Sequence, residues 1–513
     1  MTKKTFIFAL ILAIIAQCML SGFFSSKLLS SVVDGLFTKS DDWDGSYEPF
    51  SGEGTKENPY EIKTAEQLAY LARAINGDFG GESGVRYNDF TAHYELCADI
   101  YLNGHPWTPI GIGASFSSTP AEGPDDYYNE FAFHGIFDGK NHKISGLFID
   151  TSTFDRESPY VGLFGYATGR IEALNLEGVS IICYGQYYVG ALCGRSDARI
   201  ADCTASDVNI DVQYYNANQE AEKLCCGGLV GVQSAGEIYN CHTSVSICST
   251  GSVGGLVGYS SRSVNKSSSS GEIHHYGPIV AVGGLVGQMN AASLFPGLYD
   301  GYEKGQSTLS YTSCTVRSMD LTSERVGAVG GFAGSLENYH INHCYSTGTI
   351  GAPASIYDMS TNGIKAAYIG GFFGIARQSS VLGSYTTSKI YDNYSGYAGE
   401  FGGYMAHSDV STSAALALSY TVEHLSTPFP FDFVSYYYSD AADPSTVLQD
   451  CYFAVDNYYD GIPENKLDLT VPITLDDANN TMFFKETLDW ISAWDYSDLD
   501  LLNGIGPSLE KVK

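Results

Sequence analysis

Three groups of side chains in this 513-residue chain have the types and spacing to do chemistry. Neighbouring carboxylates can divide acid and base roles, closely spaced arginines can bind acidic sugars, and histidine with cysteine can bind zinc. The groups are the acid pairs Asp125–Asp126 and Asp476–Asp477, the arginines Arg195 and Arg199, and the cluster of His340, His343 and Cys344.

A simpler interpretation is available for each group. Both acid pairs lie in loop-like stretches rich in Tyr or Asn, where solvated carboxylates are expected. A position in a turn is enough to explain the two arginines. Two histidines three positions apart in a strand point to opposite faces, so they are not expected to bind one metal ion. No HExxH, GxSxG, P-loop or EF-hand pattern occurs. We therefore predict no catalytic residue, no cofactor and no metal site, in a protein that is not an enzyme.

Tyrosine is the remaining candidate for function, because the chain contains 38 of them. Exposed tyrosines combine a large contact area with a polar tip, which suits glycan or protein surfaces. The alternative is that these rings cover the corners of a repeating fold. The candidates for ligand contact lie in loop-like runs and are Tyr127, Tyr128, Tyr214, Tyr215, Tyr436, Tyr437 and Tyr438.

An internal repeat supplies the elements that must position these residues. The stretch VGGLVG, ending at Gly258, returns with small changes at spacings from 27 residues (Gly231 to Gly258) to 47 residues (Gly287 to Gly334). Its copies close at Gly165, Gly194, Gly231, Gly258, Gly287, Gly334, Gly374 and Gly403. The pattern departs at Glu400, which replaces a repeat glycine, and at Lys266–Ser267, where an Asn-Cys-like step is lost.

The repeat predicts strands, because its runs are short, rich in Val, Ile, Tyr, Thr and Ser, and broken by Gly. One unit cannot bury a face alone, whereas parallel stacking of units creates a continuous core. We predict an all-β, right-handed parallel β-helix whose glycines permit sharp corners and close backbone approach. The inward apolar ladder comprises Leu229, Leu256, Leu285, Phe332 and Phe372.

A second ladder of small side chains comprises Cys203, Cys241 and Cys344, with Ser384 at the matching place. Buried thiols behave as small hydrophobes, and in-register stacking suits disulfide geometry poorly. We therefore expect mostly free, buried cysteines.

The two ends of the stack need covers, since a solenoid exposes unpaired strand edges there. A capping box at Thr64–Gln67 predicts a short helix as an N-terminal cap, and Trp490, Trp494 and Leu501 are predicted to cover the last coil.

Charge and the N-terminus bear on location. Asp and Glu number 58 against 27 Lys and Arg, a net charge of −31, which excludes nucleic acid as a partner. Lys3 and Lys4 precede an apolar run, Phe6 to Leu20, which is typical of a secretory signal. An uncleaved anchor or lipid attachment at Cys18 are the alternatives.

The stretches already quoted resemble the GLUG repeat of bacterial surface proteins. So do the lead-in GTKENPYEIKTAEQLAYLA from Gly54, WTPIG from Trp107, FHGIFDGKNHKISGL from Phe133, and the closing segment DWISAWDYSDLDLLNGIGPSLEK. The resemblance implies a β-helical, pectin-lyase-like shape on exported, often adhesin-like proteins. It covers roughly residues 50–513 and implies no particular activity.

We expect five regions. They are a signal peptide or anchor at 1–25, a linker at 26–53, a lead-in with the capping helix and first coils at 54–150, GLUG-type coils at 151–425, and last coils with a C-terminal cap at 426–513. We expect an exported, monomeric, non-catalytic β-solenoid that binds glycan or protein at a cell surface or outside the cell. One alternative for its location is that of an outer-membrane lipoprotein. The rivals are a polysaccharide lyase or hydrolase on the same scaffold, and a passive spacer.

Overall fold

The fold is taken from a computed structural model of the whole chain. It divides into two units, Met1–Asp44 and Gly45–Lys513. The structure describes residues 43–78, 91–113, 131–154, 158–185, 187–213, 224–291, 305–319, 327–351, 368–392, 397–416, 420–421, 434–438, 447–455, 470–474, 478–479, 482–488, 494–495, 499, 501 and 507–509. The finer regional boundaries expected from the sequence stay predictions. No helix within these described ranges has the length and hydrophobicity to cross a membrane.

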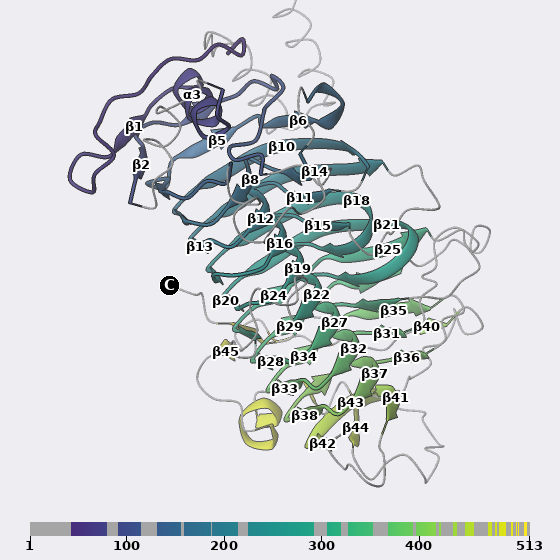
Figure 1. Ribbon diagram of the computed structural model, residues 1–513. Coiled ribbons are helices and arrows are strands. Elements are labelled where there is room, and N and C mark those ends of the chain that lie inside the picture. The colour runs from purple at the N-terminus through teal and green to yellow at the C-terminus, as the bar shows by residue number, and fades with distance from the viewer. Residues whose placement is uncertain are drawn as a thin grey trace, which may run out of the picture. The chain divides into compact units, whose positions relative to one another are not determined.

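Successive coils of the second unit stack in parallel and build three sheets along the stack (Figure 1). Sheet I contains β1 (Tyr60–Ile62), β2 (His93–Leu96), β4 (Ile136–Asp138), β9 (Arg170–Glu172), β13 (Arg199–Ala201), β17 (Ile238–Tyr239) and β20 (Val264–Asn265), and continues as β23 (Gly305–Thr308), β28 (Tyr339–Asn342), β33 (Ser380–Leu382), β38 (Asp409–Ser411) and β42 (Val447–Gln449). Sheet II contains β8 (Phe164–Ala167), β12 (Cys193–Ser196), β16 (Val230–Gln233), β19 (Val257–Ser260), β22 (Val286–Asn290), β27 (Ala333–Glu337), β32 (Phe373–Arg377), β37 (Gly402–Ala406) and β41 (Val434–Tyr438).

Sheet III is the largest of the three sheets. It contains β3 (Ile100–Tyr101), β5 (Lys143–Ser145), β6 (Phe148–Asp150), β7 (Tyr160–Val161), β10 (Asn175–Tyr184), β11 (Tyr188–Gly190), β14 (Thr204–Gln213), β15 (Cys225–Gly227), β18 (His242–Gly254), β21 (Ser268–Gly283), β24 (Tyr311–Thr312), β25 (Thr315–Met319), β26 (Ala328–Gly330), β29 (Tyr345–Ser346), β30 (Thr349–Ile350), β31 (Tyr368–Gly370), β34 (Tyr385–Thr386), β35 (Lys389–Asp392), β36 (Tyr397–Gly399), β39 (Ala414–Ala415), β40 (Tyr420–Thr421), β43 (Cys451–Val455) and β44 (Thr470–Thr474). The predicted all-β parallel β-helix is confirmed.

The predicted apolar ladder forms the centre of the core. Leu256 donates its backbone N–H to the carbonyl of Leu285, and Leu285 donates to Phe332, each at 2.9 Å. All five predicted members are fully buried. The rings of Phe332 and Phe372 stack at 4.7 Å between centroids, and Phe401 continues the stack at 4.9 Å. Equivalent side chains from successive coils therefore lie on top of one another.

The repeat glycines serve close approach rather than unusual dihedral angles. Gly254, Gly255 and Gly258 are not among the positive-φ residues. A Cβ on Gly255 would lie 2.3 Å from the carbonyl oxygen of Gly284, and one on Gly254 would lie 2.1 Å from that of Val257. The expectation of sharp glycine corners is thus wrong for this motif, since what excludes a side chain here is the neighbouring backbone.

Left-handed backbone recurs at the corner between sheets I and III, on residues of many types, and in some coils also between sheets II and I, at Asn338, Gln378 and His407. At the first of these corners, one residue in each coil has φ between 43° and 56°: Ala173, Asp202, Asn240, Lys266, Leu309, His343, Gly383, Thr412 and Asp450. The next residue of each coil is fully buried: Leu174, Cys203, Cys241, Ser267, Ser310, Cys344, Ser384, Ser413 and Cys451. Lys266–Ser267 therefore fills the step that the sequence pattern showed as lost.

Lys266→Asn is expected to stabilise the protein by up to about 1 kcal/mol, because asparagine tolerates the left-handed region better than lysine. Lys266 has φ 51° and lies 5.5 Å from the Tyr239 ring, a contact that the variant gives up. Urea denaturation would measure the change. A variant less stable than the parent would show that the corner residue is chosen for its side-chain contacts.

The buried small-residue column contains four of the cysteines: Cys203, Cys241, Cys344 and Cys451. Cys203 and Cys241 donate their thiols to the carbonyls of Ala201 and Tyr239, at 3.2 and 3.3 Å. The backbone N–H of Cys241 donates to the Ser267 hydroxyl at 3.1 Å. All eleven cysteines of the described ranges are free; nine are buried, and Cys97 and Cys248 are partly exposed. This arrangement agrees with the expectation of free, buried thiols.

In the native protein, thiol reagents at neutral pH are expected to label Cys97 and Cys248 first among these cysteines. Burial raises the pKa of Cys314 to about 11 and that of Cys344 to about 12, so both remain protonated and inaccessible. Burial also raises the pKa of Cys97 and Cys248, but their partial exposure admits the reagent. Mass spectrometry of labelled peptides would test this. Rapid labelling of Cys203 or Cys344 without denaturant would contradict the stacked column.

The predicted N-terminal helix is present as α3 (Ala65–Ile75). Thr64 accepts the backbone N–H of Gln67 at 3.3 Å, and the chain leaves the helix through Gly77, with φ 77°. Asn76 ties the helix end to the first coils, because its side chain donates to the carbonyl of Pro109 and accepts from Gly111, both at 2.9 Å. The role of α3 as an end cap stays a prediction. The other helical elements of the described residues are η1 (Thr151–Thr153) and the π-helical η4 (Phe483–Thr487).

The C-terminal residues pack against sheet III, in a cluster that extends from Tyr345 and Tyr385 to Tyr452 and Ile473 of the last described coils, and a cover over the last coil stays a prediction. Trp494 lies 5.9 and 5.4 Å from the rings of Tyr345 and Tyr385, and the hydroxyl of Tyr385 donates to the carbonyl of Pro507. β45 (Trp494–Asp495) pairs with β46 (Ser508–Leu509) beside these coils. We call the segment the C-terminal strap, defined by its buried residues Ala478, Phe483, Phe484, Leu488, Trp494 and Leu501. Trp490 lies outside the described residues.

Candidate functional site

Most of the residues predicted for function have side chains outside the described part of the chain. Tyr436, Tyr437 and Tyr438 belong to β41, whose backbone pairs in register with β37, and their side chains are outside the description. The other candidates that lie outside the described residues are Cys18, Tyr127, Tyr128, Tyr214, Tyr215, Asp125, Asp126, Asp476 and Asp477. Their roles stay predictions.

The arginines and histidines do not assemble a reaction centre. Arg195 is buried on strand β12, 3.6 Å from Asp197 and 4.7 Å above the Tyr166 ring, so it is more than the turn residue expected. Arg199 pairs with Glu237 at 3.8 Å. His340 bonds the Ser380 hydroxyl on β33. His343 occupies the left-handed corner instead of a strand, with its ring 6.2 Å from Trp494.

The most regular outer surface belongs to the four longest strands, β10, β14, β18 and β21. In β10 and β14, buried and exposed residues alternate with period two on either side of a single irregular residue, Gly178 or Asp207. The inward members are apolar, such as Val179, Ile181 and Ile210. We call the outward side the long-strand face; its small polar members are Ser180, Ser206, Asn209, Ser244, Ser246 and Ser270.

Residues on this face form columns, because the strands pair in register. Asn209 pairs with Ser180 on one side and with Ser246 on the other. Ser246 then pairs with Glu272, and Glu272 with Thr315. Adjacent strands lie about 4.8 Å apart. The same kind of polar group therefore recurs at that interval from coil to coil, on short side chains that lose little entropy when they bind.

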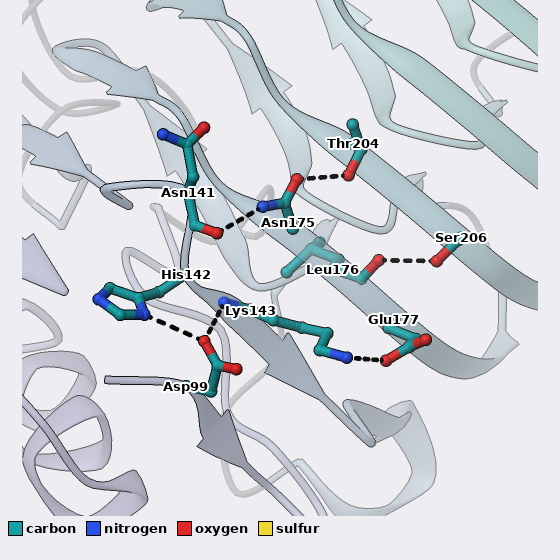
Figure 2. A network of polar contacts seen from close by, with 9 residues as sticks. All are labelled: Asp99, Asn141, His142, Lys143, Asn175, Leu176, Glu177, Thr204 and Ser206. Carbon is teal, nitrogen blue, oxygen red and sulfur yellow. Dashed lines mark hydrogen bonds and ion pairs between the residues drawn. The ribbon is translucent and has the colours of Figure 1, made fainter. Parts of the chain in front are cut away.

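Figure 2 shows the polar contacts at the N-terminal edge of the face. Asp99 accepts from the ring nitrogen of His142 and the backbone N–H of Lys143, both at 3.0 Å. The Lys143 ammonium lies 2.6 Å from Glu177 on β10. One coil further on, the Thr204 hydroxyl donates to the Asn175 side chain at 2.7 Å. These bonds cross from coil to coil and fix the orientation of the outward side chains.

The charges of this edge compensate one another. The backbone N–H of Lys143, followed by His142, lowers the pKa of Asp99. The carboxylate of Glu177 raises the pKa of Lys143. At the far end, His274 and then Arg317 lower the pKa of Glu272. All these groups are largely solvated, so they contribute little to stability and mainly set the charge of the surface.

Two exposed tyrosines border the face and were missed by the sequence reasoning. Tyr101 is 51% exposed and heads the column that continues through Ser145 and Glu177; Tyr184 is 41% exposed at the end of β10. The sequence search favoured runs of tyrosine in loops, whereas these two stand singly in strands. The period-two alternation of NLEGVSIICY, Asn175–Tyr184, was the signal that could have found Tyr184.

One outward column of sheet III changes from polar to mostly aromatic residues along the stack. It reads Lys143, Asn175, Thr204, His242 and Ser268 in the first coils, then Tyr311, Tyr345, Tyr385, Ala414 and Tyr452. The aromatic half is the half that the C-terminal strap covers. In the polar half, Lys143, Asn175, Thr204 and His242 are partly exposed and Ser268 is buried. The polar half of the column is therefore the part that can meet another molecule.

Within the described ranges, no three or more His, Cys, Asp or Glu side chains converge in a way that could hold a metal ion. The face offers hydroxyls, amides and separated carboxylates instead, which can form hydrogen bonds with a ligand. The expectations of no enzyme and no cofactor stay predictions.

A family profile described as the GLUG motif matches residues 326–351, which comprise β26 to β30. Among curated proteins, the chain is 31% identical over 154 residues to a protein of Evansella cellulosilytica provisionally named a Gly-rich membrane protein, covering 28% of this chain and 14% of that protein. It is 32% identical over 159 residues to halomucin of Haloquadratum walsbyi, covering 31% of this chain and 2% of that one. The matches therefore span a small part of both relatives.

Among solved structures, one from Bacteroides ovatus, provisionally named an immunoglobulin A1 protease, aligns over 91% of this chain and 96% of that chain. Its sequence identity to this chain is 14% and its TM-score is 0.37. The stacked parallel coils define the class of this protein as a β-solenoid. Within that class, its residues 326–351 match the GLUG motif, which agrees with the resemblance found in the sequence.

Proposed function

We propose that this protein is an exported β-solenoid that binds glycan or protein at a cell surface or in the extracellular space, through its long-strand face. The observation that carries the proposal is the face itself: a largely in-register array of small polar side chains on the earlier coils, next to the later coils that the strap covers. The names of the two curated relatives, a membrane protein and a halomucin, support a surface setting.

The physical argument is one of preorganisation. The Asn209 and Ser246 side chains project from strands whose backbones are bonded on both sides, so binding does not need to order them. A surface of this kind can hold a ligand without a cleft, because each coil contributes a similar contact. The strap fills the corresponding surface of the later coils and confines the contact to the earlier ones.

A glycan array and a panel of extracellular proteins, probed with the full chain and with Ser246→Arg, would test this. The arginine would project from the middle of the face, and binding is expected to fall at least tenfold. The matched control is Ser411→Arg on β38, where the residue also faces outward but on sheet I. No binding to any ligand, or equal losses in both variants, would contradict the proposal. Cleavage of neutral or acidic polysaccharides would favour the rival enzyme.

A further inference from the structure

We infer that the ligand of the long-strand face is a neutral polysaccharide whose chain runs along the stack of coils, across β10, β14, β18 and β21. This inference rests on the proposed function and names its ligand class. Three properties of the face restrict the class of ligand: its charge, the regular spacing of its polar groups, and the types of side chain that it offers for contact.

Charge excludes acidic polymers. The four strands contain no Lys or Arg. Their carboxylates are Glu177, Asp207, Asp211 and Glu272, and the neighbouring cations Lys143 and Arg317 already lie 2.6 and 3.7 Å from two of these. A polyanion would meet net negative charge with no arginine fork to receive its carboxylates or sulfates. A neutral polymer meets no such repulsion.

The repeat favours a polymer over a single sugar. Polar groups recur once per coil, about 4.8 Å apart, which is close to the length of one sugar ring in an extended chain. Asn209 and Ser246 offer an amide and a hydroxyl at successive steps of one column, and Ser206 and Glu177 offer a hydroxyl and a carboxylate in the next. Each added sugar therefore finds another similar set of donors and acceptors, and affinity rises with chain length.

The kind of contact favours a sugar over a folded protein. Protein interfaces depend on a few buried aromatic or arginine anchors. Along the middle of this face the outward groups are mainly serines, an asparagine and carboxylates, which match the many hydroxyls of a sugar chain. One column also contains Ile182, Cys248 and His274, none of which is an aromatic or arginine anchor. The exposed rings of Tyr101 and Tyr184 stand at its borders, where each can pack against the apolar side of a sugar ring.

Titration calorimetry with linear neutral gluco-oligosaccharides of increasing length would test the inference, with polygalacturonate and heparin as acidic comparisons. Affinity is expected to increase with length and to level off once the chain spans the four strands. The double variant Asn209→Ala, Ser246→Ala is expected to bind the longest neutral ligand about tenfold more weakly, since it lacks two hydrogen-bonding groups. The matched control, Gln449→Ala, removes an exposed amide from β42 on sheet I and should bind as the parent does.

Equal or tighter binding of the acidic polymers, or affinity independent of length, would overturn the inference. If a protein ligand binds through the face, as judged by Ser246→Arg, while no neutral glycan does, the polysaccharide inference fails and the proposed function stands. If ligands bind but neither the double variant nor Ser246→Arg affects them, both fail. Unchanged thermal unfolding of the variants would show that any loss is one of binding.

Discussion

Replacing Gly255 by alanine is expected to destabilise the protein by about 3 kcal/mol or more, or to prevent folding. The added methyl would lie 2.3 Å from the carbonyl oxygen of Gly284 and 2.7 Å from the Cys314 sulfur. Because the first of these atoms is backbone, relief requires two coils to move apart. That movement breaks bonds on both sides, including the 3.0 Å bond from the Gly255 N–H to the Gly284 carbonyl. Urea denaturation followed by far-UV circular dichroism would measure the loss.

Gly104→Ala is the matched control, since it separates two contributions to the loss of stability. One is the steric cost of the added methyl group, and the other is the cost of placing alanine in a left-handed backbone conformation. Gly104 has φ 69°, and a Cβ there meets nothing within 4 Å. Its substitution should cost only about 1–2 kcal/mol, from the left-handed conformation. If Gly104→Ala proved as damaging as Gly255→Ala, conformational freedom rather than coil spacing would explain the repeat glycines.

Trp494→Ala is expected to release the C-terminal strap while leaving the coils folded. The indole is 4% exposed and packs on Tyr345 and Tyr385, so its loss should cost the strap about 3–5 kcal/mol of packing. A loss of that size raises the population of the detached strap more than a hundredfold, since about 1.4 kcal/mol corresponds to tenfold. Limited proteolysis at the strap and binding of a hydrophobic dye would report it.

The coils should survive because their own bonds do not involve the strap. The backbone N–H of Tyr385 donates to the carbonyl of Cys344, and that of Tyr345 to Ser310, each at 3.1 Å. In a solenoid each coil is held mainly by its neighbours, so a lateral cover can detach alone. Met482→Ala, which changes a 61% exposed residue of the same segment, is the control. Cooperative unfolding of the whole chain on Trp494→Ala would instead indicate an end cap.

The sequence predicted the stacked ladder because repetition is visible without knowledge of the register. Leu229, Leu256 and Leu285 stand at the same place in each VGGLVG copy, and burial follows from their type. The left-handed corner has no comparable signal. Asn240, Lys266 and Leu309 share a conformation but no chemistry, so the corner is recognised only once the coils are aligned in space.

The candidate face was missed for a related reason. Each outward residue of β10 or β14 is an ordinary serine, asparagine or carboxylate, and what distinguishes it is the column that it shares with other coils. The strap shows the same limit: Trp494 and Leu501 were recognised as apolar cover, but the surface that they cover depends on Tyr345 and Tyr385 standing in one column. Which residues share a column depends on the pairing register of the strands, and that register is known only from the folded structure.

Distances between spin labels along one outer column would test the in-register stack most directly. Labels would be placed at Asn209 and Ser246, one coil apart, and at Ser180 and Thr315, four coils apart. The accessible thiols Cys97 and Cys248 would first be replaced by serine. Backbone separations near 5 and 19 Å are expected, since each coil adds about 4.8 Å. Similar distances for the two pairs, or a shorter distance between Ser180 and Thr315 than between Asn209 and Ser246, would contradict the stacked columns and the face that they form.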